Sequence, residues 1–274
     1  MGRSMVKLIF FVFFLIPGLV FCAKESLGNS TVSKTTPRSP SMRTNPDPEI
    51  KPVKSKGMMN KFVDNITGTM SLTSNYLFRG LTQTENLPAV QGGFTYTTSL
   101  GLYATVWSSN NKFIGTDINL EVDPGMGFYK EIGKDLNFDV AFYRYLFPSD
   151  RIWNYNEWIG QVNYKFLQSN LGYSGNVYNV KRKGLYYDGG INYPIPAKYL
   201  FGIEDVIFLA LAGRYELPKD FPDEAGISYN TYTVSISKGF KHYNLALQYS
   251  NTTERAFYQW YGGDKLACTL TTSF

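Results

Sequence analysis

Alternating polar residues in one stretch of the sequence are the strongest candidate for chemistry in this chain. They are Asp117, Asn119, Glu121 and Asp123. Successive side chains of a β-strand point to opposite faces, so this spacing places three carboxylates and one amide on a single face. Walls of carboxylates along a channel favour cations. The pattern predicts a negatively charged wall of a water-filled lumen, to which Asp139 of the next alternating segment contributes.

The same carboxylates have other interpretations. If the strands close into a narrow barrel, these carboxylates could pair with lysines inside it, such as Lys165 and Lys265. They would then fill the interior instead of lining a pore. Carboxylates also bind Ca²⁺, but a spacing of two along a strand is not the arrangement of a calcium-binding loop. The sequence has no GxGxxG motif, Walker loop or zinc-ligand spacing. We therefore predict no metal, cofactor or nucleotide site.

Enzymatic chemistry has one candidate. His242 is the single histidine, and Ser235 and Ser237 lie shortly before it. A histidine that activates a serine would make the protein a membrane-embedded lipid hydrolase. A histidine at the rim of a barrel is the preferred interpretation, so we predict that the protein is not an enzyme.

The elements that would position these residues are about twelve alternating segments. The predicted strands span residues 67–78, 89–98, 101–109, 116–131, 135–146, 157–166, 169–180, 185–193, 204–216, 228–238, 242–252 and 264–274. In the last strand, Leu266, Leu270 and Phe274 share one face and Thr269 and Thr271 share the other. One apolar face and one small polar face suit a barrel with lipid outside and water inside. A soluble β-sandwich is the structural alternative.

The connections between these strands give a second, independent signal. Gaps after odd-numbered strands are mostly long and gaps after even-numbered strands mostly short, with exceptions at 181–184 and 194–203. Outer-membrane barrels have short periplasmic turns and longer extracellular loops. The pattern predicts that both ends of the barrel chain lie on the periplasmic side. Pro124-Gly125 is expected to form a bulge or kink within one long strand, because Pro and Gly often mark these.

Aromatic side chains concentrate near the ends of the predicted strands. They include Tyr76, Phe78, Trp107, Tyr145, Phe147, Trp153, Trp158 and Tyr193. Outer-membrane barrels carry aromatic girdles at both membrane interfaces, and these residues are predicted to form them. A carbohydrate-binding surface on the outer loops, with Trp153, Trp158 and Trp260, is the alternative.

The residues before the predicted barrel divide into two segments. Residues 1–23 contain basic residues followed by a short, interrupted apolar run, which predicts a cleaved signal peptide. Residues 24–61 are rich in Ser, Thr, Pro and Lys and are expected to be a disordered periplasmic tail. Ten of the 27 basic and three of the 22 acidic residues precede residue 62, which leaves 17 and 19 in the predicted barrel, residues 62–274. This balance excludes a basic nucleic-acid-binding surface.

Several motifs are similar to a known family. SLTSNYLFRG (71–80), PAVQGGF (88–94) and GLYATVW (101–107) are followed by KEIG (130–133) and DLNFDVAFYRYLFP (135–148). Over about residues 66–274 the chain resembles the TorF-type family of predicted porins, which are conserved hypothetical bacterial outer-membrane β-barrel proteins. The resemblance implies an outer-membrane barrel, suggests a diffusion pore and brings no catalytic residues. Phe274 at the end of an alternating strand resembles the assembly signal of such barrels.

The sequence therefore predicts an all-β protein, a transmembrane antiparallel up-and-down β-barrel in the cell outer membrane of a Gram-negative bacterium. Its expected function is porin-like passive, selective diffusion of small solutes, and its expected partners are outer-membrane lipid, the barrel-assembly machinery and those solutes. Arg79 is predicted at the rim, as a selectivity or loop-anchoring residue or paired with Glu85. A non-transport barrel with a structural, adhesive or surface-binding role is the functional alternative. The sequence leaves the oligomeric state open.

Overall fold

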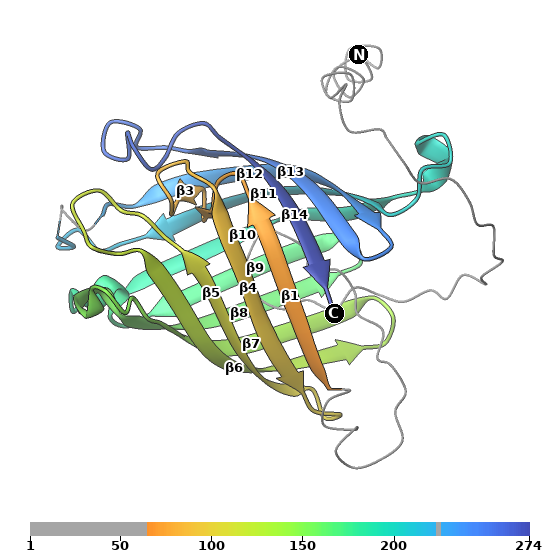
Figure 1. Cartoon of the computed structure of the whole chain (residues 1–274), viewed down its shortest axis with the longest axis horizontal. Helices are drawn as coiled ribbons and strands as arrows, with labels where there is room; N and C mark the ends of the chain where they lie inside the picture. The colour runs from red at the N-terminus through yellow and green to blue at the C-terminus, as the bar shows by residue number, and fades with distance from the viewer. Residues whose placement is uncertain (1–64, 223–225) are drawn as a thin grey trace. The chain divides into compact units, whose positions relative to one another are not determined.

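The computed structural model describes residues 65–222 and 226–274 (Figure 1). The predicted signal peptide, residues 1–23, and the predicted tail, residues 24–61, lie outside the described residues. The first three residues of the predicted barrel lie outside them as well.

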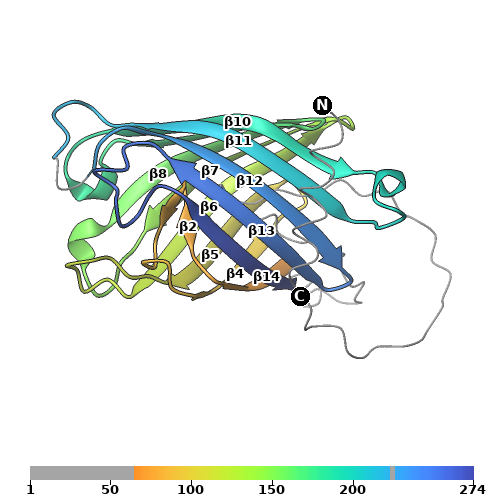
Figure 2. The same cartoon turned by 90° about the horizontal axis from the view of Figure 1, so that it is seen from above.

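Twelve antiparallel strands close into one barrel, in which consecutive strands pair and the first pairs with the last. The barrel strands are β1 (Ile66–Thr73), β4 (Ala89–Thr97), β5 (Leu102–Asn110), β6 (Leu120–Ile132), β7 (Leu136–Tyr145), β8 (Tyr155–Tyr164), β9 (Leu167–Ser174), β10 (Gly184–Ile195), β11 (Val206–Glu216), β12 (Tyr229–Phe240), β13 (Tyr243–Thr252) and β14 (Lys265–Ser273). The short strands β2 (Leu77–Phe78) and β3 (Leu81–Thr82) pair with each other. The prediction of an all-β, up-and-down barrel of twelve strands is confirmed (Figures 1 and 2).

Helical structure in the described residues is confined to short 3-10 turns. These are η1 (Arg151–Trp153), η2 (Val177–Asn179) and η3 (Ala197–Tyr199). Within residues 65–222 and 226–274, no helix has the length and apolar character needed to cross a membrane.

The two faces of the barrel wall have opposite chemistry, as β14 shows. Leu266 and Leu270 are 65% and 42% exposed, whereas Thr269 and Thr271 are each 3% exposed. The predicted alternation is likewise observed in β7, β12 and β13. A soluble protein buries its apolar residues, so an apolar exposed face around a polar interior indicates that lipid surrounds the barrel.

Connection length distinguishes the two ends of the barrel. At the short-turn end the connections are residues 98–101, 133–135, 165–166, 196–205 and 241–242. At the long-loop end they are residues 74–88, 111–119, 146–154, 175–183, 217–228 and 253–264. The predicted alternation of short and long connections is confirmed. The expected short gap at 181–184 is wrong, because β9 ends at Ser174 and a long loop follows it.

The strand β6 runs through Pro124-Gly125 as one element of 13 residues, as predicted. Its register with β5 is continuous, so the expected bulge is not present. Pairing with β7 is interrupted between Gly125 and Val122. Pro124 explains the interruption, because it has no N–H to donate to the neighbouring strand.

After β1 the chain leaves the barrel wall and folds inward. We call residues 74–88, which contain β2 and β3, the lumen hairpin (Figure 1, at the end away from the C-terminus). Arg79 and Gly80 connect the two strands with φ of 50° and 82°. Two positive φ values are typical of the tight two-residue turns of β-hairpins. The prediction of one strand over 67–78 is therefore wrong beyond Thr73.

Contacts at the tip of the lumen hairpin show that it lies inside the barrel. The Arg79 side chain binds Glu157 of β8, and the Arg79 carbonyl accepts a hydrogen bond from Tyr229 Oη of β12 at 3.1 Å. A Cβ at Gly80 would lie against Thr231 of β12 and Thr252 of β13. A segment that follows β1 and contacts these strands together must occupy the lumen.

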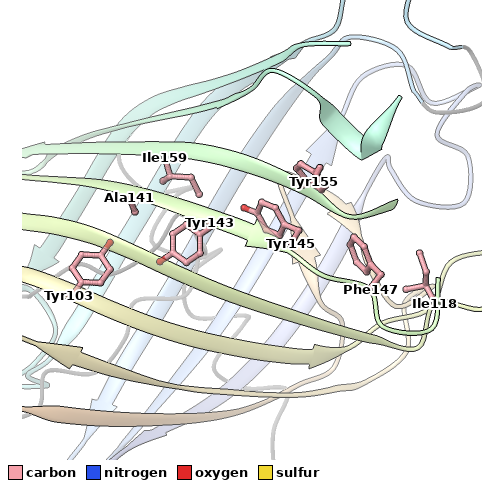
Figure 3. Packing of buried hydrophobic residues seen from close by; sticks show 8 residues of the cluster. All are labelled: Tyr103, Ile118, Ala141, Tyr143, Tyr145, Phe147, Tyr155 and Ile159. Carbon is pink, nitrogen blue, oxygen red and sulfur yellow. The ribbon is translucent and has the colours of Figure 1, made fainter. Parts of the chain in front are cut away.

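Aromatic side chains fill the lumen around the hairpin. Figure 3 shows Tyr143, Tyr145 and Phe147, from β7 and the residues after it, beside Tyr155 of β8. A second buried cluster contains Tyr186, Tyr215, Tyr229 and Tyr258. The barrel is therefore packed with side chains toward its long-loop end.

This packing changes the interpretation of the aromatic girdles. Tyr76, Tyr145 and Phe147 are buried, so their assignment to a girdle is wrong. Trp158 and Tyr193 are exposed on the outside of the barrel, where a girdle residue would lie. Tyr145 lies in phase with the buried Asp139 along β7, and this phase turns it toward the lumen.

Candidate functional site

A buried ion pair joins the lumen hairpin to the barrel wall. Arg79 Nη1 donates to Glu157 Oε1 at 2.9 Å, and Nη2 donates to Oε2 at 2.8 Å. The two side chains are 3% and 0% exposed. Two parallel N–H···O bonds give an arginine–carboxylate pair both strength and a fixed orientation. Tyr145 Oη also donates to Glu157 Oε2 at 3.0 Å, which holds the carboxylate in place.

Arg79 stays charged in this environment. Burial is the largest single effect and would lower the pKa of Arg79, but the Glu157 carboxylate, its hydrogen bonds and the nearby Tyr215 and Tyr145 together outweigh it. The pKa of Arg79 is consequently raised well above its usual value. The lumen hairpin is thus attached by a permanent cation.

Aromatic rings surround the guanidinium. Its Cζ lies 4.4 Å from the ring centroid of Tyr186, 5.2 Å from that of Tyr215 and 4.6 Å from that of Phe78. Ring faces attract cations at such distances. Gly172 provides space, because a Cβ at this position would overlap Arg79 Nη2. The wall residues that surround the guanidinium, which we call the cation cage, are Tyr145, Glu157, Gly172, Tyr186 and Tyr215.

A methyl group at Gly172 should loosen the lumen hairpin without changing any charge. We expect Gly172→Ala to displace the guanidinium at a cost of about 1–3 kcal/mol, as for overpacked interiors. The readout is maleimide labelling of Leu77→Cys, a buried hairpin position, in a Cys268→Ala background. Labelling should become several-fold faster.

The matched control is Gly160→Ala on the neighbouring strand β8. A Cβ at Gly160 would have its nearest neighbour, Leu171 Cβ, at 4.0 Å. This variant should label at the original rate. Equal rates in the Gly172→Ala and Gly160→Ala proteins would contradict the packing described for the cation cage.

Three of the predicted pore-lining residues are buried in the lumen. Glu121 and Asp123 lie on β6, and Asp139 lies on β7. Glu121 accepts a hydrogen bond from Asn111 Nδ2 at 3.0 Å, and Asp139 accepts one from Tyr103 Oη at 2.8 Å. They are part of a packed wall and not of a freely hydrated one.

The other half of the predicted acidic stripe lies outside the strand. Asp117 and Asn119 are exposed in the loop 111–119 because β6 begins at Leu120. Ile118 is buried instead, so the alternation in the loop is opposite to that expected. A period of two holds only while the chain remains extended and paired.

The two predicted lumen lysines lie in different places. Lys165 is exposed in the turn between β8 and β9 at the short-turn end. Lys265 begins β14 on the face shared with the buried Ala267, and its Nζ donates to the Trp260 carbonyl at 3.3 Å.

The prediction that Arg79 lies at the rim is wrong. Its side chain is inside the barrel with Glu157, and Glu85 instead pairs with Lys112 at 3.1 Å. The cause is the early end of β1 at Thr73, which sends the following residues into the lumen. Phe274 is exposed at the short-turn end, where its ring lies 6.1 Å from that of Phe94.

Two buried carboxylates were not predicted from the sequence. Glu157 of β8 anchors Arg79, and Asp188 of β10 accepts hydrogen bonds from Tyr186 Oη at 2.8 Å and Asn170 Nδ2 at 2.6 Å. Each lies on the same face of its strand as the other buried residues. This alternation was the sequence signal that could have placed both carboxylates in the lumen. In residues 65–222 and 226–274, no group of three or more His, Cys, Asp or Glu side chains is placed to bind a metal ion.

Comparison with solved structures finds several porins with a similar course of the chain. The KdgM porin in complex with disordered oligogalacturonate is 9% identical, with 76% of this chain and 98% of that chain covered and a TM-score of 0.46. The NanC porin is 10% identical, with the same coverages and a TM-score of 0.49. OccK5 (OpdH) of Pseudomonas aeruginosa is 11% identical, with 77% and 67% covered and a TM-score of 0.36.

Comparison by sequence gives the family. A search of curated proteins finds no match. Residues 63–255, which span β1 to β13, match the family described as a bacterial protein of unknown function (Gcw_chp). The chain therefore belongs to the Gcw_chp family of bacterial proteins.

Proposed function

We propose that this protein is a porin-like channel of the TorF type in the bacterial outer membrane, for passive, selective diffusion of small solutes. The observation that carries the proposal is a closed barrel with an apolar exposed face and a polar interior. Only helices and closed barrels satisfy every backbone polar group in lipid. The short-turn end would face the periplasm and the long-loop end the outside.

The lumen hairpin makes this a narrow channel. Twelve strands enclose a smaller lumen than those of the large porins. The hairpin tip extends from β1 to Glu157 of β8 and is surrounded by buried aromatic residues. We propose that solute passage requires the hairpin to move from this position.

Lumen charge should favour cations. Asp139 lies buried on β7, and in its ionised form it places a negative charge close to any ion that passes. Asp139→Asn should reduce the cation-to-anion permeability ratio on the order of fivefold, the effect of about 1 kcal/mol for two nearby charges. Reversal potentials in a KCl gradient give this ratio. Asp117→Asn, an exposed carboxylate outside the strands, is the control and should leave the ratio nearly unchanged.

Planar-bilayer recordings of the complete mature protein test the proposed channel. Discrete conductance steps from folded, heat-modifiable protein would support it. Anion preference in the unaltered protein would reject the role of the lumen carboxylates. Absence of conductance in the unaltered protein and in a variant without the hairpin attachment would reject the channel.

The lumen hairpin also favours a second candidate, a plugged barrel whose outer loops bind a surface or another molecule. The outcome of the recordings on hairpin variants separates the two functions. A lipid hydrolase is less supported, because His242 is exposed in a turn whereas Ser235 and Ser237 are buried on the lumen face of β12. Retained lipase activity in His242→Ala would remove that histidine from any such mechanism.

A further inference from the structure

The cation cage and its occupant come from separate parts of the chain. The cage residues belong to β7, β8, β9, β10 and β11, which are consecutive strands of the wall. The guanidinium belongs to Arg79 at the tip of the lumen hairpin. The wall therefore forms a binding site for a cation, and a segment that is not part of the wall supplies the cation.

The chemistry of the cage is that of a site for a planar organic cation. Glu157 offers two oxygens with bidentate geometry, at 2.9 and 2.8 Å from Nη1 and Nη2. Tyr186 and Tyr215 contribute ring faces at 4.4 and 5.2 Å from Cζ. A carboxylate with aromatic faces distinguishes a guanidinium from a strongly hydrated metal cation, because the ring faces replace little of the metal ion's hydration. Gly172 leaves the room that the flat group occupies.

The backbone at Arg79 is unfavourable for arginine. Its φ of 50° belongs to the left-handed region, which Gly and Asn adopt more readily. Local turn geometry therefore does not account for an arginine here, whereas the fit of its side chain to the cage does.

We propose that the cation cage is a binding site for small organic cations, guanidinium compounds in particular, and that Arg79 occupies it as a tethered competitor. The proposal rests on the proposed channel function and names the solute class that the channel would favour. A solute cation that binds the cage displaces Arg79, and this displacement frees the tip of the lumen hairpin.

Calorimetric titration of the folded, detergent-solubilised protein with methylguanidinium tests the site. Arg79→Asn and Arg79→Gly empty the cage, and both residues suit the positive φ of the turn. Both variants should bind methylguanidinium saturably. The tethered Arg79 competes at an effective concentration of about millimolar, so a cage with a Kd of about 0.1 mM for a guanidinium group should bind methylguanidinium about tenfold more weakly in the unaltered protein.

Two controls identify the site. Arg79→Asn/Glu157→Gln should lose the binding, because the cage then lacks its carboxylate. Potassium chloride at equal ionic strength should not reproduce it. Equal binding in the unaltered and Arg79→Asn proteins, or binding that survives Glu157→Gln, would overturn the proposal.

Conductance in KCl without methylguanidinium separates this proposal from the channel itself. An Arg79→Asn protein that conducts but does not bind methylguanidinium rejects the cation site and retains the channel. One that binds it through Glu157 but never conducts retains the site and assigns it to a plugged barrel.

Discussion

Replacing Glu157 by Gln is expected to turn a mostly closed barrel into one that conducts. Glutamine has nearly the same shape but leaves the guanidinium of Arg79 buried without its counter-charge. Breaking a buried ion pair on one side costs about 3–5 kcal/mol. The inserted position of the lumen hairpin should lose that stabilisation. Relative to the unaltered protein, the equilibrium should shift about a hundredfold or more toward a position in which the hairpin has left the cation cage.

Single-channel recording measures this shift as the fraction of time spent in the open state. The Glu157→Gln protein should be open far longer than the unaltered protein. The matched control is Glu216→Gln, which removes one partner of the exposed pair between Arg214 and Glu216, 3.3 Å apart. Exposed pairs contribute little, so this variant should behave as the unaltered protein.

A disulfide can show that hairpin movement causes the conductance. A Cβ at Gly80 would lie 3.3 Å from Thr231 Cβ, slightly below the roughly 3.5–4.5 Å of a disulfide, so a small shift of the hairpin allows the bond. Cysteine at this position is strained, because φ is 82° and Thr252 Cγ2 would lie 2.6 Å from its Cβ, so the reduced double-cysteine protein with Glu157 intact is the reference. Glu157→Gln combined with Gly80→Cys and Thr231→Cys, in a Cys268→Ala background, should be closed when oxidised and conduct when reduced. Equal conductance of the oxidised and reduced proteins would show that ions pass by a path that does not depend on the lumen hairpin.

A double substitution tests whether the pair acts through uncompensated charge. Arg79→Asn/Glu157→Gln removes both charges, so the folded barrel should be more stable than Glu157→Gln alone. It should still conduct, because the hairpin has lost its attachment. Thermal unfolding and bilayer recording together separate these two effects. If the double variant is less stable than Glu157→Gln, the burial of an unpaired Arg79 charge does not explain the loss of stability in Glu157→Gln.

The barrel could be predicted from the sequence because lipid and lumen impose a strict period of two on each strand. In β14 the apolar Leu266 and Leu270 alternate with Ala267 and Thr269 over the whole strand, and the structure keeps that phase. The alternation alone specifies which face of such a strand meets lipid, because a slip of the register by one residue would move every apolar side chain from the lipid to the lumen.

The lumen hairpin could not be predicted in the same way. The pattern typical of a strand continues past Thr73 through Tyr76, Leu77 and Phe78, so the sequence predicts that these residues end the first strand. The determining partner, Glu157, is 78 residues away in sequence. Nothing local in Arg79-Gly80 distinguishes a turn inside the lumen from one at the rim.

For the aromatic residues, the alternation of side chains along a strand could have distinguished lumen residues from girdle residues. Tyr143 and Tyr145 share the parity of Asp139 in β7, so alternation alone places them on the polar, inward face. For Tyr145 the residue type suggested a girdle at the membrane interface, whereas its position relative to Asp139 indicated the lumen. Position decides, because side chains of one parity share one face of the wall.

Loss of the Phe274 ring is expected to reduce assembly of the protein in cells to a small fraction. The ring is exposed on the outside of the barrel at the short-turn end, where assembly factors in the periplasm would reach it. It covers Gly68 of β1 and lies 6.1 Å from the ring of Phe94 of β4, so it also spans the closing seam. Phe274→Ala should lower the yield of heat-modifiable protein in outer-membrane fractions, and wild-type yield would reject the role.

The two roles of Phe274, recognition and seam packing, are separated by changing its neighbour. Gly68→Ala keeps the C-terminal sequence but forces the ring aside, because a Cβ at Gly68 would lie 2.5 Å from Phe274 Cε2. The backbone bonds between Gly68 and Phe274, at 2.8 and 3.0 Å, involve no side chain and remain possible in both variants. If the ring acts in recognition, Phe274→Ala should assemble poorly in cells yet refold well in detergent. Gly68→Ala should then assemble normally. If the ring acts through packing, both variants should lose stability in detergent as well as yield in cells.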